Sequence, residues 1–291
     1  MHWSAAQSLQ PDVLVAATAA GPVRLRLAAD RAALYRDAAE AMLQEVRTAA
    51  EADRPCRLIV PVGPRGPYAE FVRLCLEQRL RLDHVRLFGM DEYLDAHGRW
   101  LPADHPLSLR GWLLEALAPL HRSGLKPEAV SFPDPQRPSA YSEALADAGG
   151  VDACFGGIGI HGHVAFNEPP DLRHGQPEPE TLADAPTRVV ALTPETVVMN
   201  SIRANGGDLA NFPTHAVTVG LAEIRAARRL RLYADGGTWQ RSVLRRALFS
   251  PPDVAWPVTL LAGHPDYTLT ADPETAAPTH ADAAAAGGPA R

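Results

Sequence analysis

Short apolar runs alternate with longer amphipathic stretches from about residue 24 to residue 275, and this alternation constrains the fold more than any other feature. Apolar runs that end near Val62, Phe88 and Phe155 have the length of buried strands, whereas 31–50 carries alanine and leucine at helical spacing. Strands that alternate with helices build βαβ units, in which helices cover a parallel sheet. The sequence therefore predicts an α/β fold with a mainly parallel central sheet flanked by helices.

The alternating region is predicted to form one domain, residues 25–275, preceded by residues 1–24 as an N-terminal extension. Residues 276–291 are rich in Ala, Gly and Pro and contain no bulky apolar residue, so this tail is expected to be disordered. Residues 170–186 lack periodicity and contain several prolines, which is typical of a long surface loop or lid.

The composition argues against several classes of partner. The formal net charge of −6 disfavours a nucleic-acid or anionic-membrane surface, because both require a basic patch. The sequence shows no stretch of about eighteen apolar residues that would span a membrane and no signal-peptide pattern at its start. Cys56, Cys75 and Cys154 have wide, unpatterned spacing, which is typical of buried thiols. We therefore expect a cytoplasmic protein whose partner is a small molecule.

Two adjacent carboxylates, Asp91 and Glu92, follow the apolar run 85–88. Ligands bind at the carboxyl ends of strands in α/β sheets, so these side chains are candidates for acid–base chemistry. Neighbouring side chains on an extended segment point in opposite directions, hence only one of the two is expected to act as a base. Burial would raise the pKa of that carboxyl and allow it to take a carbon-bound proton next to a carbonyl. The alternative is that the pair caps the following turn.

A glycine-rich run at 156–169 follows another predicted strand and contains His161, His163 and Glu168. His163 could carry a proton to or from a sugar ring oxygen, with Glu168 orienting the imidazole and tuning its basicity. Two alternatives remain. Loop histidines can be solvated side chains, and two imidazoles with Glu168 and Asp91 also offer enough ligands for a metal ion. The spacing matches no established metal motif, so a site without metal is expected.

The segment 63–67 joins a predicted strand to a predicted helix, where backbone N–H groups often hold an anion. Pro64 and Pro67 have no N–H, so this loop offers fewer donors than a glycine or threonine loop. Arg65 could compensate by binding a phosphate, sulfonate or carboxylate through two parallel hydrogen bonds. A structural turn is the alternative.

Several motifs, in order along the chain, resemble those of the glucosamine-6-phosphate deaminase/isomerase family. Members of that family carry a Met-Asp-Glu-Tyr run and a Gly-Gly-x-Gly-x-Asp-Gly-His-x-Ala-Phe-Asn-Glu-Pro run. The matching segments here are 90–93, 102–108, 156–169, 192–201, 216–220 and 256–265. The resemblance implies a Rossmann-like three-layer fold, deamination coupled to aldose–ketose isomerisation without metal or cofactor, and often a homo-oligomer.

The resemblance also implies a role for individual residues. Asp91 matches the base that moves a proton from C2 to C1 through an enolamine. His163 matches the residue that opens the pyranose ring, and Glu168 matches the carboxylate of its relay, in which His161 would also take part. The residues expected to contact the substrate are Gly63, Arg65, Gly66, Glu92, Gly157, Ala165, Arg203 and Trp239.

Departures from the family pattern concern the relay and the far end of the substrate. The family has an aspartate where this chain has His161, so His163 loses a negative partner. The family holds its phosphate with a glycine/threonine loop, an arginine after an Asn-Ser pair and a lysine after a late strand. Here Ile202 takes the place of the arginine, with Arg203 beside it, and Trp239, which could stack on a sugar face, takes the place of the lysine. We therefore expect a distal group that is not an ordinary 6-phosphate.

Two other functions compete with an amino-sugar deaminase. A sugar-lactone hydrolase of the 6-phosphogluconolactonase type uses a similar Gly-x-Gly-x-Asp-Gly-His loop, but the carboxylate at Glu168 has no place in its pattern. A catalytically impaired paralogue that only binds sugar is the other alternative, because of His161.

Overall fold

The computed structural model describes residues 1–175 and 177–280. Its central sheet has seven strands in the order β1-β10-β9-β6-β2-β3-β5, and every pair of neighbours is parallel. The strands are β1 (Arg24–Leu27), β2 (Cys56–Val60), β3 (Val85–Gly89), β5 (Val130–Ser131), β6 (Ala153–Gly157), β9 (Leu230–Ala234) and β10 (Tyr267–Ala271). The predicted α/β fold with a mainly parallel sheet is confirmed.

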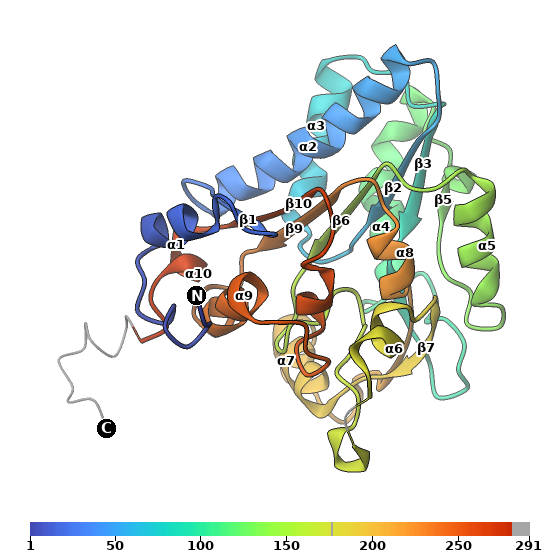
Figure 1. Ribbon diagram of the computed structural model, residues 1–291. Coiled ribbons are helices and arrows are strands. Elements are labelled where there is room, and N and C mark those ends of the chain that lie inside the picture. Colours follow the sequence, from blue (N-terminus) through green and yellow to red (C-terminus); the bar gives the residue numbers. More distant parts are fainter. Residues whose placement is uncertain (176, 281–291) are drawn as a thin grey trace.

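Helices cover both faces of this sheet, which gives three layers (Figure 1). Within β2, Leu58 and Val60 pack with residues of α2, α3 and α4, whereas Ile59 packs with the opposite core, which includes residues of α5, α8 and α9. A strand buried on both faces must be apolar at consecutive positions, and this explains the continuous apolar run. The helices are α1 (Pro11–Thr18), α2 (Arg31–Glu51), α3 (Gly66–Glu77), α4 (Leu109–Leu117), α5 (Ser139–Asp147), α6 (Pro179–Ala183), α7 (Pro194–Ala204), α8 (Leu221–Arg225), α9 (Arg241–Phe249) and α10 (Pro273–Ala276).

A second, antiparallel sheet lies beside the first and has the order β4-β8-β7. Its strands are β4 (Asp91–Tyr93), β8 (His215–Thr218) and β7 (Arg188–Ala191). The sequence places Asp91 and Glu92 after the strand at 85–88 and predicts no strand of their own, and the structure corrects this. Three residues are too few to show an alternating pattern in the sequence, and the strand forms because it pairs with β8, more than 120 residues further along the chain.

Both ends of the predicted domain need correction. In the supposed extension 1–24, α1 packs beside β1 and α10, and Leu14 is fully buried (Figure 1). The buried guanidinium of Arg245 donates to the carbonyls of Ala6 (2.8 Å) and Leu9 (3.0 Å), which ties this segment to α9. At the other end Ala276 is buried and Thr279 donates its N–H to Gln7 at 2.9 Å. The predicted disordered tail is therefore wrong for 276–280, and 281–291 lie outside the described residues.

The segment 170–186 is less irregular than predicted. It contains a short 3-10 helix, Leu172–His174, and the helix α6, whose Ala183 belongs to the same hydrophobic core as residues of α8 and the central sheet. Pro179 stands at the first position of α6, where its missing N–H costs no hydrogen bond. Among residues 1–175 and 177–280, no helix has the length and apolar character required to cross a membrane.

The strand order reverses between β2 and β6. From β2 the chain proceeds outward through β3 to β5, whereas β6, β9, β10 and β1 extend in the other direction. In open α/β sheets the crevice at such a reversal, outside the carboxyl ends of the strands, is where ligands bind. The loops after β2 and β6 flank this crevice, and both contain predicted site residues.

Candidate active site

A cavity of about 480 Å³ opens at this reversal. Its walls come from the segments that follow β2, β3, β6 and β9, together with parts of α2 and α7. The residues that line it are Tyr35, Pro61, Val62, Gly63, Pro64, Arg65, Met90, Asp91, Tyr93, Leu107, Leu109, Gly157, Ile158, Gly159, His163, Ala165, Phe166, Asn200, Arg203, Ala204, Asp235 and Gln240. The volume fits a ligand of the size of a sugar phosphate.

Asp91 and Glu92 project to opposite sides of β4, as predicted for an extended segment. Asp91 lines the cavity and is 7% exposed. Burial, with a smaller contribution from the negative charge of Glu92, raises the pKa of Asp91 from 3.8 to about 8. A carboxyl with such a pKa is matched to proton transfer near neutral pH.

Glu92 does not line the cavity, and its predicted contact with substrate is corrected. It is fully buried beneath α4, where Oε2 accepts hydrogen bonds from the Ser108 hydroxyl (2.7 Å) and the Arg110 N–H (2.9 Å). Its Oε1 accepts from the N–H groups of Leu109 (3.0 Å) and Tyr93 (2.8 Å). Glu92 therefore satisfies the free donors at the start of α4 and places a negative charge at the positive end of that helix.

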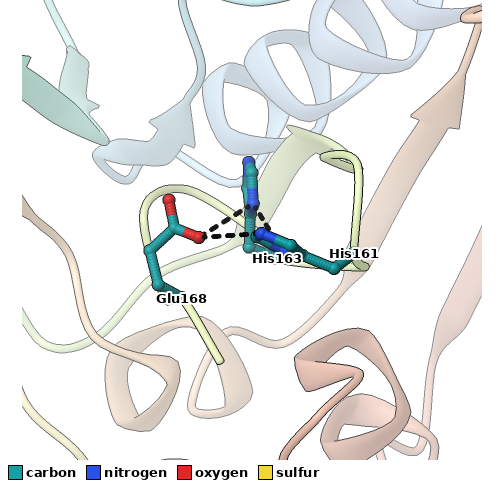
Figure 2. A group of neighbouring side chains, drawn as sticks. All are labelled: His161, His163 and Glu168. Atoms are coloured by element: carbon teal, nitrogen blue, oxygen red, sulfur yellow. Dashed lines mark hydrogen bonds and ion pairs between the residues drawn. The ribbon is translucent and has the colours of Figure 1, made fainter. Parts of the chain in front are cut away.

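His163 lines the cavity, whereas His161 and Glu168 do not. The three side chains point toward one another (Figure 2). Nδ1 of His163 lies 3.5 Å from Oε2 of Glu168 and 3.3 Å from Nδ1 of His161, while Nε2 of His161 lies 3.5 Å from the same carboxylate oxygen. A side chain at Gly159 would place its Cβ only 1.8 Å from Nε2 of His163. Nε2 therefore occupies the space above Gly159, another residue of the cavity wall.

Two threonine hydroxyls complete this relay. Thr193 and Thr196 each donate to Oε2 of Glu168 at 3.2 Å, and Thr193 also lies 2.8 Å from Nε2 of His161. Thr193 is the N-cap of α7, so the start of this helix holds the relay in place. Both threonines belong to a segment that resembles the family, and the sequence interpretation gave neither of them a role.

The two side chains that contact His163, Glu168 and His161, differ in their charge at neutral pH. Burial would raise the pKa of Glu168, but the hydrogen bond from His163 and the two imidazoles outweigh it and hold that pKa below its ordinary value. Burial and the neighbouring His163 lower the pKa of His161, against the opposing effect of Glu168. At neutral pH this arrangement contains an ionised Glu168 beside a neutral His161.

Close packing of the backbone shapes the floor of the cavity. A Cβ at Gly157 would lie 3.0 Å from the carbonyl oxygen of Gly63, so the loops after β6 and β2 approach each other more closely than a side chain allows. Ala165 has a positive φ of 52°, a strained conformation for a residue with a side chain. Asn167 stabilises this turn by donating to the carbonyls of Val164 and Val219, both at 2.9 Å.

Besides Asp91 and His163, the cavity wall contains two arginines, Arg65 and Arg203, and a further carboxylate, Asp235. Arg65 stacks on Trp112 with its Cζ 4.7 Å from the ring centroid, and Arg203 lies 5.5 Å from the ring of Trp239. Among the described residues neither guanidinium makes an ion pair. Asp235 accepts a hydrogen bond from the hydroxyl of Tyr35 at 2.7 Å. This part of the wall therefore combines two available cations with one acceptor.

The predicted substrate contacts divide accordingly. Gly63, Arg65, Gly157, Ala165 and Arg203 line the cavity. Gly66 does not, because it packs against the ring of Tyr35, where a Cβ would come within 2.1 Å of a ring carbon. Trp239 does not line the cavity either, but its ring lies against Arg203, which does.

Several residues of the cavity wall had no assigned role in the sequence interpretation. Tyr93 and Asn200 stand in segments that resemble the family, and Asn200 donates to the hydroxyl of Tyr93 at 3.1 Å. Tyr35, Asp235 and Gln240 carry no local signal, because 200 residues separate Tyr35 from Asp235 along the chain.

Comparisons with known proteins identify relatives of this chain. No protein-family model matches the chain. The chain is 37% identical over 216 residues to the glucosamine-6-phosphate deaminase of Mycolicibacterium smegmatis, a match that covers 72% of this chain and 76% of that relative. It is 31% identical over 259 residues to the enzyme of the same name from Porphyromonas gingivalis, with 86% and 91% covered. The chain belongs to the glucosamine-6-phosphate deaminase family.

Solved structures confirm the fold of this family member. A monomeric glucosamine-6-phosphate deaminase of the NagB superfamily superimposes with a TM-score of 0.72 at 23% identity, with 87% of this chain and 98% of that chain covered. A 6-phosphogluconolactonase from Trypanosoma cruzi gives a TM-score of 0.64 at 20% identity, with 87% and 95% covered. At such identities the deaminase and the lactonase share the fold with this chain, and the fold alone does not separate their reactions.

Proposed function

We propose that this family member converts an amino-sugar phosphate into a ketose phosphate and ammonia, by aldose–ketose isomerisation coupled to deamination. One observation carries the proposal. A buried carboxyl with a pKa raised to about 8, Asp91, and an imidazole backed by a carboxylate relay, His163, line the same cavity. A base for a carbon-bound proton and a shuttle for a hydroxyl proton are the two groups that this reaction requires.

Ring opening is the task of His163. Its Nδ1 faces Glu168 and His161, which leaves Nε2 for the cavity. Nε2 takes the proton of the C1 hydroxyl and returns it to the ring oxygen, and the C1–O5 bond breaks to give the open aldehyde. The ionised Glu168 stabilises the imidazolium that forms between these two transfers.

Asp91 acts next on the open-chain sugar. The ionised carboxylate takes the proton from C2 while a proton passes from the C2 ammonium group to O1, giving an enolamine. The carboxyl then returns its proton to C1, which leaves a protonated imine at C2. Addition of water to the imine carbon and departure of ammonia give the ketose, so no oxidant or reductant is consumed. The raised pKa of Asp91 makes its carboxylate a stronger base than an exposed aspartate.

The arginines support an anionic group at the distal end of the substrate. Arg65 and Arg203 line the cavity from different elements and can each donate to a phosphate in the bidentate manner of guanidinium groups. Asp235, in the same cavity wall, can accept a hydrogen bond from a hydroxyl of the sugar. The two guanidinium groups therefore lead us to propose a phosphate at the distal end, which replaces the expectation drawn from the departures in the sequence.

Ammonia release from a panel of sugars tests both parts of the proposal. We expect product from glucosamine 6-phosphate, and Arg203→Met should raise KM about 10- to 100-fold with a smaller change in kcat, since hydrogen bonds to a charged group contribute roughly 1.5–3 kcal/mol. Equal activity on free glucosamine, unchanged in Arg203→Met, would instead favour a neutral distal group. Sugar binding without ammonia from any sugar would favour the impaired, binding paralogue.

The lactonase alternative has weaker support. The sequence relatives described above are deaminases, whereas the lactonase resembles this chain in fold alone. Glu168 also stands 3.5 Å from both imidazoles, in the relay that the deaminase pattern requires. Hydrolysis of 6-phosphogluconolactone by the purified chain, without deaminase activity, would favour the lactonase over the deaminase.

We further propose a homo-oligomer in the cytoplasm, as the family resemblance and the composition indicated. Light scattering on the purified chain tests the first statement. The location of a tagged chain in its own host tests the second.

A further inference from the structure

The relay behind His163 has the composition of a metal site. His161, His163 and Glu168 each offer one ligand atom, and these atoms all lie within 4.8 Å of one another (Figure 2). The aspartate that the family resemblance led us to expect at position 161 would leave a single imidazole. With His161 the group contains two imidazole nitrogens and one carboxylate, a ligand set that zinc uses in proteins.

Whichever nitrogen of His161 is the ligand, two of the three separations within the group match those around a tetrahedral ion. Zinc binds imidazole nitrogen and carboxylate oxygen at about 2.0–2.2 Å, so two ligand atoms of one ion are separated by roughly 3.3–3.5 Å. Here Nδ1 of His163 lies 3.5 Å from Oε2 of Glu168, and the rings of His161 and His163 approach to 3.3 Å between their Nδ1 atoms. His161 reaches the carboxylate at 3.5 Å through its other nitrogen, Nε2.

We propose that His161, His163 and Glu168 form a binding site for a divalent transition-metal ion of the zinc type. The ion would be bound by Nδ1 of His163, one nitrogen of His161 and the Glu168 carboxylate.

The charge and hydrogen bonding of Glu168 support this site. Glu168 is 8% exposed, and among the described residues its ionic contacts are only with the two imidazoles. Its Oε1 is buried and has no hydrogen-bond partner among those residues. A divalent cation would balance the negative charge of the Glu168 carboxylate. The hydroxyls of Thr193 and Thr196 already donate to Oε2 and would hold the carboxylate in the orientation that the ion requires.

Metal binding would change what His163 can do. A neutral imidazole that binds a metal through Nδ1 carries its proton on Nε2, the nitrogen above Gly159. That nitrogen could then donate a hydrogen bond into the cavity but could not accept the proton of a sugar hydroxyl. The ion would therefore inhibit ring opening, a consequence that rests on the proposed function.

Calorimetric titration of the EDTA-treated full chain with ZnCl₂ at pH 7.5 tests the site without any activity measurement. We expect one high-affinity site, weakened about 100-fold or more in His161→Asn and in Glu168→Gln, because loss of a direct ligand costs at least as much as loss of an outer-shell partner. His97→Asn, at an exposed histidine in the turn after β4, is the matched control and should bind as the unaltered chain does. Circular dichroism identifies a variant that fails to fold, and the remaining variant then decides.

Two results would overturn the site. One is the absence of binding to the unaltered chain, and the other is the same affinity in the folded His161→Asn or Glu168→Gln variant. Inhibition is read separately, as loss of ammonia release on addition of ZnCl₂ and its recovery with EDTA. Zinc binding that leaves ammonia release unchanged would contradict inhibition alone. Zinc binding with no ammonia release from any sugar would overturn the proposed function and leave the site standing.

Discussion

Each face of β4 carries one buried carboxylate, and the two carboxylates have different roles. On the cavity face, Asp91 is buried, its carboxylate accepts no hydrogen bond from residues 1–175 or 177–280, and its pKa rises to about 8. On the opposite face, Glu92 accepts four hydrogen bonds, three from residues 108–110 at the start of α4 and one from the N–H of Tyr93. Both carboxylates are removed from water, but only the charge of Glu92 is stabilised by hydrogen-bond donors. The comparison shows that these donors, more than burial, decide whether a buried carboxylate is structural or can act as a base.

The largest difference between the two faces should appear in turnover. Asp91→Asn removes the base, and we expect kcat for ammonia release to fall about 10³-fold or more, within the upper range for general base catalysis. Folding should not suffer. Since the pKa of Asp91 is raised on folding, the stability it contributes is full below about pH 3.8 and is lost as pH rises through about 8. Thermal unfolding at pH 8.5 should show the variant to be at least as stable as the unaltered chain.

The cavity face should also set the pH dependence. Asp91 acts as a base only when ionised, so kcat/KM should rise with pH and level off above about pH 8, and at pH 6 it should be about a hundredfold lower. The second ionisation of a phosphate monoester, near pH 6, lies about two units lower and can be distinguished. A profile that is flat between pH 6.5 and 8.5 would show that the rate does not depend on the ionisation of Asp91.

The α4 face should respond in stability instead. Glu92→Gln replaces a charged acceptor by a neutral one, and we expect the free energy of unfolding to fall by about 2–3 kcal/mol in a denaturant titration. At pH 8.5 kcat/KM should stay within about threefold of the value for the unaltered chain, which corresponds to a change of less than ~0.7 kcal/mol in activation free energy. The inflection of the pH profile should move down, because the charge of Glu92 contributes to the raised pKa of Asp91. Glu143→Gln, at an exposed position of α5, is the control. A loss of turnover as large as in Asp91→Asn would show that Glu92 also acts in catalysis and would contradict its structural role.

The smallest effect is expected at the partner of Glu92. Ser108 donates to Glu92 and accepts from the N–H of Gly111 at 2.9 Å as the N-cap of α4. Ser108→Ala should therefore cost about 1 kcal/mol of stability, typical of a lost N-cap, with unchanged kcat. Ser139→Ala, at the exposed first residue of α5, should cost less. Equal losses in the two variants would argue against the capping role of Ser108.

Much of this contrast follows from the sequence. The period of a strand separates Asp91 from Glu92, and the apolar runs of β2, β3 and β6 predict the sheet whose carboxyl ends form the cavity. The partner of Glu92 could not be predicted, because Ser108 lies 16 residues away and meets it only in the folded chain.

Two other regions show the same limit. The N-terminal segment joins the domain through backbone carbonyls that accept from Arg245, and backbone acceptors leave no pattern of side chains. At the distal end of the cavity, Tyr35 meets Asp235 across 200 residues of chain. Local periodicity thus predicts the scaffold, whereas contacts between distant segments decide the details of the site.

The central claim is that Asp91 removes the C2 proton, and this can be followed directly. Proton NMR of glucosamine 6-phosphate in D₂O reports the C2 hydrogen and the interconversion of the two anomers in one spectrum. The account predicts that Asp91→Asn leaves the C2 hydrogen in place while His163 still accelerates interconversion, and that Glu92→Gln removes it as the unaltered chain does. Loss of the C2 hydrogen in Asp91→Asn at the rate of the unaltered chain would contradict it.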